Sequence, residues 1–286
     1  MSQFKRMTLA AATAAFTISA SAAGLDLGNG TLFGIVSAGA GSSLKINSGP
    51  VTGSVLVGDG TSVSTSGGNN GQITGVIADD GTVPQSAFGG LQTPPTSGQF
   101  STVSASYVQS AVASAQAVSA YASSLAPVKV CALLMLLKVW FGASGVYVID
   151  VNNIQNADLT FSGNASTRFV VNVSGTYQTN KTITLSGVSP SQLLFNFTGT
   201  SGNVFQTSGG DLSYGTYLAT DGGNFQFSNL NLTGALINTA GHIEFVSGSK
   251  LTAAGLVPEP QSYAMLLAGM GVVAFVSRRR SPGRHA

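Results

Sequence analysis

The sequence predicts a mainly β protein, a β-solenoid with one α-helix packed along it. Glycines recur every twelve residues between positions 163 and 199, separated by short runs in which apolar and polar residues alternate. A five-residue pattern at 51–55 returns twenty-two residues later at 73–77. Short strands repeated at a period of about twenty residues are typical of a solenoid, in which each coil adds strands to stacked parallel sheets.

The first strand-forming stretch runs from position 25 to position 83. Its candidate strands are residues 31–36, 43–46 and 53–57, with Gly, Asn, Asp and Ser between them as turns. The spacing of the first two copies of the five-residue pattern suits one coil. A third copy stands far downstream at 232–236.

A loop rich in proline and glycine, at 82–98, precedes a predicted amphipathic helix at about 100–125. Apolar residues stand three or four positions apart and form one face of this helix, while Ser, Ala and Gln fill most other positions. A helix that lies on a membrane surface needs a basic face, which is absent here. We therefore expect the helix to pack along the side of the solenoid.

Residues 128–141 differ in composition from the segments around them. This stretch holds the only cysteine, Cys131, and the only tryptophan of the chain, and its apolar part is too short to span a membrane. Two interpretations are open: a buried strand or second helix, or a local irregularity of the sequence such as a compensated frameshift. Because there is one cysteine, no intramolecular disulfide can form.

The strand pattern is strongest from position 144 to position 254. In the run 193–197, alternation places Phe195 and Phe197 on one face and Leu194 and Asn196 on the other. We expect aliphatic and aromatic side chains inside the coils, with Ser, Thr and Asn outside.

The N-terminal residues 1–23 are predicted to be a secretory signal peptide that forms a signal helix. Lys5 and Arg6 precede an apolar run at 7–18, and small residues follow it as the cleavage region: Ala20, Ala22 and Ala23. The apolar run is too short for a spanning helix. The secretion translocon is therefore an expected partner.

The C-terminal residues 257–286 consist of three physically different parts. The first part contains prolines, which cannot donate to a strand ladder, so the folded domain should end before them. The second is an apolar run at about 261–277, which predicts a transmembrane helix, and the third is an arginine cluster, which should stay on the cytoplasmic side. At about 1.5 Å per residue the run is about 25 Å long, so it spans a bilayer core of about 30 Å only with thinning or arginine snorkelling. The residues of the two polar parts are Val257, Pro258, Glu259, Pro260, Arg278, Arg279 and Arg280.

This order of parts at the C-terminus resembles the PEP-CTERM sorting signal of Gram-negative bacteria. The resemblance implies export, transient insertion in the inner membrane, processing by an exosortase near the Pro-Glu-Pro sequence, and final association with the cell surface or the extracellular polysaccharide matrix. An ordinary single-pass tail anchor is the alternative.

The remaining residues, 24–256, form the predicted mature domain. Six basic residues stand against nine acidic ones there, which gives a net charge of −3. Nucleic-acid binding requires a basic face, and this balance does not provide one.

Four segments of the mature domain resemble the bacterial choice-of-anchor A domain and, more distantly, the bacterial and fungal ice-binding adhesins. They are residues 145–148, 168–175, 193–197 and 232–237. The resemblance implies a right-handed β-helix with a helix packed along it, on an exported protein. Residues 128–141 do not match the pattern of the family.

Candidate catalytic residues are few in the mature domain. His242 is its only histidine and shares a strand face with Glu244, which fits a paired surface role better than a catalytic one. Asp79, Asp80 and Asp150 follow no metal-binding pattern. We therefore expect no enzyme activity, no cofactor and no metal.

Three functions from different classes remain. The first is a structural or adhesive surface protein held in extracellular polysaccharide, the second an ice-binding or glycan-binding module, and the third a polysaccharide lyase or hydrolase, which needs clustered carboxylates or a basic residue in a groove. For the second, a flat face around Thr182 and Thr184 would order water or contact sugars, and it predicts a ladder of aligned threonines or aromatics. The explicit address signals and the scarcity of catalytic residues favour the first.

Overall fold

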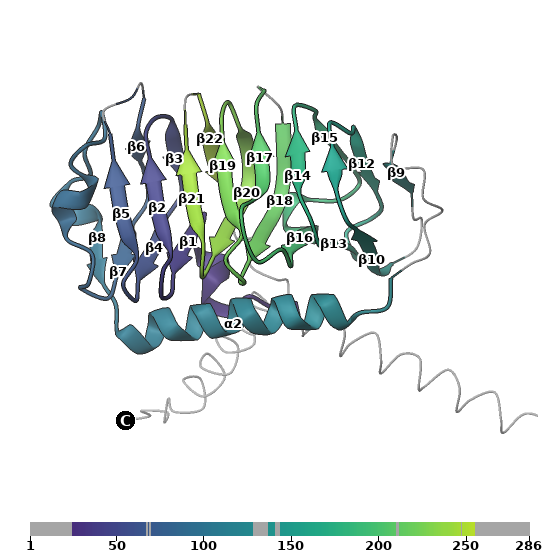
Figure 1. Ribbon diagram of the computed structural model, residues 1–286, viewed down its shortest axis with the longest axis horizontal. Helices are drawn as coiled ribbons and strands as arrows, with labels where there is room; N and C mark the ends of the chain where they lie inside the picture. The colour runs from purple at the N-terminus through teal and green to yellow at the C-terminus, as the bar shows by residue number, and fades with distance from the viewer. Residues whose placement is uncertain are drawn as a thin grey trace, which may run out of the picture. The chain divides into compact units, whose positions relative to one another are not determined.

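The computed structural model describes residues 25–66, 68, 70–127, 144–209, 212–246 and 248–254, together with the backbone of residues 137–140. Their strands stack into coils in which every strand pairing is parallel, and one long helix, α2 (Ala105–Ser124), runs along the outside (Figure 1). The mainly β solenoid with one accompanying helix is confirmed. The predicted signal peptide, the Pro-Glu-Pro sequence and the predicted transmembrane helix lie outside the described residues, and none of the described helices is long and apolar enough to cross a membrane.

Three sheets form the sides of the solenoid. Sheet A has the order β10-β13-β16-β18-β20-β1-β4-β7-β8, with β22 joined to β20, β3 to β22 and β6 to β3. Its strands are β1 (Ile35–Ala38), β3 (Pro50–Thr52), β4 (Val55–Gly58), β6 (Gln72–Ile73), β7 (Ile77–Asp79), β8 (Phe100–Thr102), β10 (Gly145–Val151), β13 (Thr167–Val173), β16 (Leu193–Phe197), β18 (Leu212–Ala219), β20 (Asn231–Asn238) and β22 (Lys250–Ala253). Sheet B consists, in order, of β11 (Ile154–Gln155), β14 (Tyr177–Thr179), β17 (Asn203–Thr207), β19 (Asn224–Phe227), β21 (His242–Phe245), β2 (Ser43–Ile46) and β5 (Ser62–Thr65). Sheet C pairs β12 (Leu159–Ser162) with β15 (Ile183–Ser186) and with β9 (Leu137–Trp140).

The sequence repeats correspond to coils of the solenoid. Ile35, Val55 and Ile77 are partners in successive coils, so these coils are twenty and twenty-two residues long. Leu159 and Ile183, twenty-four residues apart, are partners in later coils. The twelve-residue spacing of the glycines therefore marks two turns in each coil.

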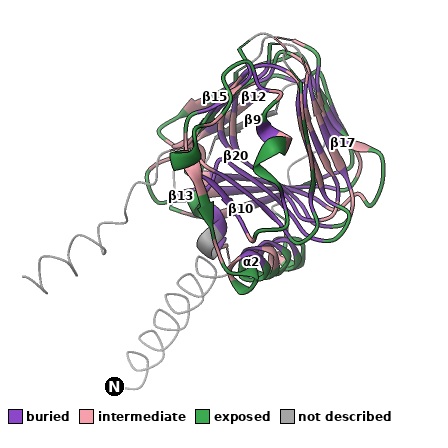
Figure 2. Ribbon diagram, turned by 90° about the vertical axis from the view of Figure 1, so that its left-hand side faces the viewer, coloured by how far each residue is buried: buried purple, intermediate pink, exposed green. Residues whose placement is uncertain are grey.

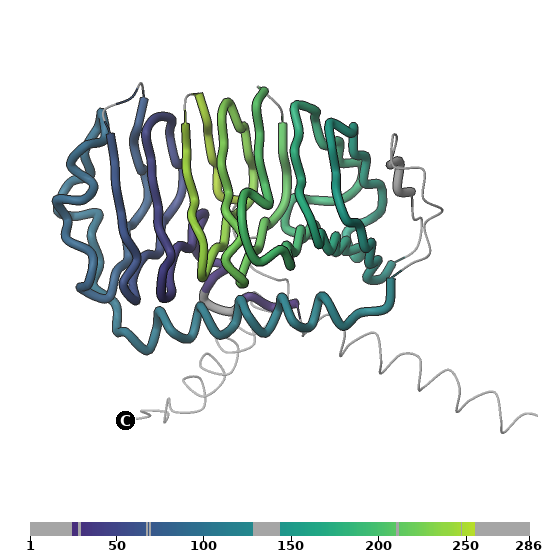
Figure 3. Tube along the Cα trace, viewed as in Figure 1, coloured from purple at the N-terminus to yellow at the C-terminus, as the bar shows by residue number. Residues whose placement is uncertain are grey.

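The first and the last coils of the chain meet in the middle of the solenoid. β20 pairs with β1, β21 pairs with β2, and β22 pairs with β3, although about two hundred residues separate the partners (Figure 3). β22 and β1 pair with the first and second halves of β20, so together they act as one strand of a composite coil. This arrangement explains why the third copy of the sequence pattern, at 232–236, shares a row with the first two copies: the row is Leu232, Leu251, Val51 and Ile73.

Apolar side chains fill the inside of the coils. Figure 2 shows by its colouring that much of the strand ribbon is buried. Phe195 and Phe197 point inward as predicted, and their rings stack near that of Tyr217, which lies 4.7 Å from Phe195 and 4.4 Å from Phe205 between ring centroids. Offset stacking of this kind adds to the stability gained by burying aromatic area. The N-terminal coils carry aliphatic residues at the equivalent inward positions, among them Ile35, Val55 and Ile77.

Helix α2 covers the outer surface of sheet A. The helix begins at Ala105 rather than near position 100, because residues 100–102 pair as β8 and the Ser104 hydroxyl caps the helix by accepting a hydrogen bond from the Tyr107 N–H at 3.1 Å. Its inner face is made of small residues that let it approach the sheet closely: Val108, Ala111, Ala115, Val118 and Ala122. The predicted packing of an uncharged amphipathic helix along the solenoid is thus confirmed.

Outward residues of sheet A beneath α2 are buried even where they are polar. Asn196, predicted to lie outside the coil, does so, and it is fully buried under the helix. Its Nδ2 atom donates to the Ser119 carbonyl at 3.2 Å, the Ser123 hydroxyl at 3.1 Å and the Asn172 Oδ1 at 2.9 Å. Asn172 in turn donates to the Ala122 carbonyl and to Asp150. This asparagine ladder fixes the C-terminal half of α2 on the sheet.

The stretch 128–141 is described only in part. The backbone of β9, at 137–140, pairs in parallel with β12 at the edge of sheet C. This pairing agrees with the strand interpretation for these four residues. Cys131 and the leucines that precede β9 lie outside the described residues.

Candidate binding faces

Sheet B presents a flat outer face that α2 does not cover. The outward-pointing central positions of its strands are polar, as at Gln226, which stands between the buried residues Phe225 and Phe227. Because side chains alternate along a strand and the coils stack in register, the polar residues line up across the sheet. In order along the solenoid they are Gln155, Gln178, Gln206, Gln226, Glu244, Lys45 and Ser64. We call the four glutamines the amide row.

At the end of this line that lies on the first and last coils, the charged side chains neutralise each other. Lys45 Nζ lies 2.8 Å from Glu244 Oε1, and the Gln226 amide donates to Glu244 Oε2 at 3.2 Å. His242 Nε2 lies 3.7 Å from the same carboxylate oxygen, and its Nδ1 is 2.6 Å from the Ser43 hydroxyl. The sequence prediction of a paired surface role for His242 and Glu244 matches this geometry.

The ionisation of the cluster follows from its surroundings. The hydrogen bond from Lys45 lowers the pKa of Glu244, so the carboxylate is charged at neutral pH. Burial lowers the pKa of His242, and the nearby Lys45 acts in the same direction while Glu244 opposes it. The imidazole is therefore neutral at pH 7, and the face carries one matched pair of charges.

The other end of the line has free hydrogen-bonding capacity. Gln206 donates to Gln226 at 3.4 Å, and the Gln226 carbonyl also accepts from Asn203 at 3.0 Å. Gln155 and Gln178 are exposed, and their side chains have no hydrogen-bond partner in the part of the chain that the structure describes. Each amide can both donate and accept.

A groove runs beside the amide row. Its volume is about 300 Å³, and its lining comes from β14, β17, β19 and the end of β21: Gln178, Gln206, Thr207, Ser208, Gln226, Phe227, Ser228 and Val246. Since these strands follow one another along the solenoid, the groove crosses them and follows the solenoid axis. Its walls combine amide, hydroxyl and aliphatic groups.

Sheet A carries a second regular line, the threonine row, where β20, β22, β3 and β6 adjoin. Thr233, Thr252 and Thr52 are partners in successive coils, and Thr74 follows in the next coil, where its N–H donates to the Val51 carbonyl at 3.0 Å. Thr52, Thr74 and Thr252 are exposed. A ladder of aligned threonines, which the ice-binding hypothesis predicts, is therefore present on sheet A.

The predicted positions lie on sheet C. Thr184 is exposed on β15 and pairs with Thr160 on β12, while Thr182 is half-buried and precedes β15. The structure brings Thr184 together with Thr160, and Ser186 with Ser162, in two short rows.

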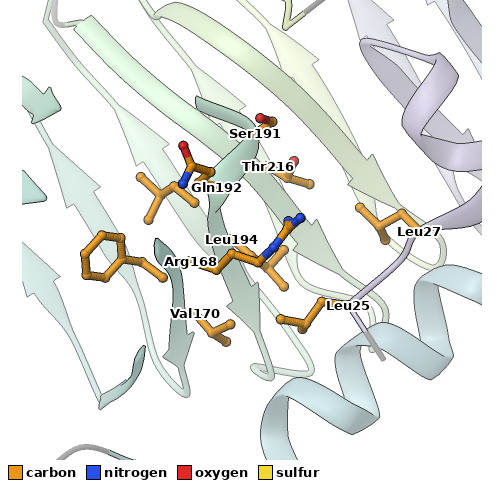
Figure 4. A pocket seen from close by; sticks show the side chains of 10 residues that line it. Leu25, Leu27, Arg168, Val170, Ser191, Gln192, Leu194 and Thr216 are labelled. Atoms are coloured by element: carbon orange, nitrogen blue, oxygen red, sulfur yellow. The ribbon is translucent and has the colours of Figure 1, made fainter. Parts of the chain in front are cut away.

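The other candidate sites among the described residues are less suited to binding a ligand. A cavity of about 50 Å³ lies where Arg168 extends over Leu25 and Leu27 beside sheet A (Figure 4), which is too small for a sugar ring. Asp79 and Asp80 bind backbone N–H groups of the turn at 79–82 and of Asp59. No group of three or more His, Cys, Asp or Glu side chains that could hold a metal occurs among the residues described.

The comparisons with solved structures identify the class of the fold: a β-solenoid flanked by a helix, as in ice-binding proteins. The chain is similar to an ice-binding protein from an Arctic yeast (TM-score 0.55, 18% identity, 82% of this chain and 96% of the other). It is similar to the DUF3494 domain of an ice-binding protein from Shewanella frigidimarina (TM-score 0.52, 14% identity, 81% and 98%). It is also similar to the ice-binding protein of the Antarctic ascomycete Antarctomyces psychrotrophicus (TM-score 0.50, 15% identity, 81% and 98%). At these identities the likeness concerns the fold.

One family model matches a segment at the C-terminal end of the chain. Residues 256–280 match the PEP-CTERM protein-sorting motif, which confirms the resemblance seen in the sequence. The motif implies that the protein is exported to the cell surface or the extracellular space. No curated protein matches the chain by sequence.

The amide row was not predicted from the sequence. Its signal is present in the sequence as a polar residue between two apolar ones or between an aromatic and a threonine, in segments such as 177–179, 205–207, 225–227 and 243–245. The coils have unequal lengths, however, so the four glutamines stand twenty-three, twenty-eight and twenty residues apart. Only the pairing of the strands places them in one line.

Proposed function

We propose that this exported protein binds extracellular polysaccharide through the outer face of sheet B. The observation that carries the proposal is the amide row, whose free glutamines stand in register beside a groove. A polysaccharide presents hydroxyl groups at regular intervals, and primary amides can donate to and accept from them. A rigid sheet holds the backbone positions of these amides at a spacing of about 4.8 Å, so binding has to order only the glutamine side chains and not the backbone.

The groove favours binding over cleavage. Hydrolysis of a glycosidic bond requires two carboxyl groups on either side of the bond. Glu244, which continues the line of the amide row, already holds Lys45 and Gln226. A retained, matrix-associated binding protein therefore fits the site and the sorting motif together.

Co-sedimentation of the mature protein with matrix polysaccharide extracted from the producing cells tests this function. The double variant Gln178→Ala and Gln206→Ala should lose most of the bound fraction, whereas Ser64→Ala, at the far end of the same line, should keep it. Both glutamines are solvent-accessible, so the double variant should retain the circular-dichroism spectrum of the parent. If neither the parent protein nor the Ser64→Ala variant co-sediments with any matrix fraction, the proposal is wrong.

We further propose that an exosortase processes the protein near Pro258-Glu259-Pro260 after transient insertion of residues 261–277 in the inner membrane. The matched motif at 256–280 supports this step. Fractionation of cells with and without the exosortase tests it: the tail-bearing form should accumulate in the membrane fraction when the enzyme is missing. Replacing Arg278, Arg279 and Arg280 by alanine should also reduce processing, and processing that continues unchanged in both cases would contradict the proposal.

Ice binding is the second candidate function, and two observations favour it. The solved structures of similar fold are ice-binding proteins, and the threonine row offers hydroxyl and methyl groups at a regular spacing of about 4.8 Å. Thermal hysteresis of the mature protein tests this candidate. Thr252→Tyr should abolish activity if the threonine row binds ice, and Thr184→Tyr should do so if sheet C binds it. Zero hysteresis in the parent protein would eliminate the candidate.

A further inference from the structure

Within the described residues, the side-chain amides at one end of the amide row are hydrogen-bonded, whereas those at the other end are free. Gln226 uses both ends of its amide within the protein, donating to Glu244 and accepting from Asn203 and Gln206. Gln155 and Gln178 use neither within the described residues, and Gln206 keeps its carbonyl free. The capacity to bind a ligand is thus concentrated on β11, β14 and β17.

The groove fixes the direction in which a ligand can lie. It passes from Gln178 on β14 over β17 and β19 to Val246, across the strands and along the solenoid axis. Adjacent strands lie about 4.8 Å apart, so three steps from Gln155 to Gln226 cover about 14 Å. An extended chain fits this path, and a compact ligand would contact only one or two rungs.

The charges around the groove decide the class of polymer. Lys45, the one basic side chain in the register line, is already paired with Glu244 at 2.8 Å, and it lies beyond the satisfied end of the row. An anionic polymer would meet no free cation along the groove lining. The polar groups that line the groove are uncharged amides and hydroxyls, which match the hydroxyls of a neutral sugar.

The aromatic rings of this region do not contribute stacking surfaces. Phe227, the aromatic residue of the groove lining, is fully buried, and so are Tyr177, Phe205 and Phe225. Recognition therefore depends on hydrogen bonds, which are individually weak in water, so a useful affinity requires several rungs to be engaged at once.

Resting on the proposed function, we infer that the groove takes an extended, uncharged polysaccharide that lies along the solenoid axis and is held by Gln155, Gln178 and Gln206. The chain contacts one amide on each rung. Binding strength grows with chain length until the row from Gln155 to Gln226 is covered, and then stops growing.

Calorimetric titration of the mature protein with linear neutral glucan oligosaccharides of about two to about eight units, and with alginate oligosaccharides of equal length, tests the inference. We expect the affinity for the glucans to rise about tenfold or more between two and four units and then to level off, with no binding of alginate. Gln178→Ala should remove the length dependence, and the matched variant Ser64→Ala should preserve it.

The outcomes separate this inference from the proposed function. Binding of alginate in preference to glucan, or an affinity for glucan that does not change with length, overturns the inference and leaves polysaccharide binding intact. Binding of glucan that is unaffected by Gln178→Ala overturns the assignment to the amide row. Failure to bind both oligosaccharides and the extracted matrix polysaccharide overturns the function itself.

Discussion

Replacing Asn196 by alanine should loosen the attachment of α2 to sheet A. The Asn196 side chain lies between the helix and the sheet, where it is fully buried and donates to two acceptors on α2 and to Asn172 Oδ1. Helix α2 is otherwise held by apolar contacts, made largely by alanine and valine side chains, and by the hydrogen bond from Asn172 to the Ala122 carbonyl. The substitution thus removes polar contacts that no neighbouring group can replace.

The magnitude of the loss follows from three contributions. The Ser119 carbonyl and the Ser123 hydroxyl each lose a hydrogen bond from the Asn196 amide, at about 1 kcal/mol each, and the buried Oδ1 of Asn172 loses a donor, at about 1–3 kcal/mol. Against these, the substitution also removes the Asn196 Oδ1, which has no hydrogen-bond partner in the described structure, and this relief is worth about 1 kcal/mol. The net destabilisation should be about 2–4 kcal/mol, equivalent to about 4–16 °C in Tm for a domain of this size.

Urea and thermal unfolding followed by circular dichroism measure this loss. Ser123→Ala is the matched control, because it removes one exposed partner of Asn196 and should cost less than about 1 kcal/mol. Protease sensitivity of residues in α2 should rise in Asn196→Ala and not in the control. A destabilisation below about 0.5 kcal/mol would refute the view that the asparagine ladder fixes the helix.

Two further predictions concern the junction of the first and last coils. The first is that stability should fall as the pH is lowered from 7 to 4. The pKa of His242 is lowered in the folded protein, so the unfolded chain takes up this proton first, near pH 6.5, and the lowered pKa of Glu244 adds a second loss of stability near pH 4.5, which Glu244→Gln should remove. Urea unfolding that gives equal stability at both pH values would contradict this prediction. The second is that Gly49→Ala should destabilise the protein by about 3 kcal/mol or more, because a Cβ at this φ of +94° would lie 1.6 Å from the Ser249 carbonyl oxygen of the last coil. The control Gly41→Ala has a similar φ of +83° but open space around the Cβ position, so it should cost about 1 kcal/mol. Equal losses in denaturant unfolding would show that the coils do not meet as closely at Gly49.

The local pattern of the chain was enough to predict much of the fold. Alternation in 193–197 placed Phe195 and Phe197 inside the coil, and the three-and-four spacing of apolar residues predicted α2 to within a few residues at its start. These predictions hold because strand alternation and helix periodicity are properties of neighbouring residues. The start of α2 was wrong by five residues because residues 100–102 are held as a strand by pairing with β7, a partner that local periodicity does not reveal.

The candidate sites depended on contacts between distant parts of the chain. The sequence pointed to a face around Thr182 and Thr184, whereas the longer threonine row combines Thr52 and Thr74 with Thr233 and Thr252 from the other end of the sequence. Lys45 and Glu244 meet for the same reason. No repeat length predicts these rows, because the chain leaves the solenoid through α2 and returns to close it from the opposite end.

The sequence by itself determined the address and the building unit of this protein: a C-terminal sorting motif and strands that repeat at the length of one coil. Both features depend on residues that are neighbours in the sequence. Only the tertiary structure decided which polar residues share a face, because coils of eighteen to twenty-eight residues bring them into register through backbone pairing rather than through constant spacing. The amide row and the neutralised pair beside it are therefore products of strand pairing across the whole solenoid.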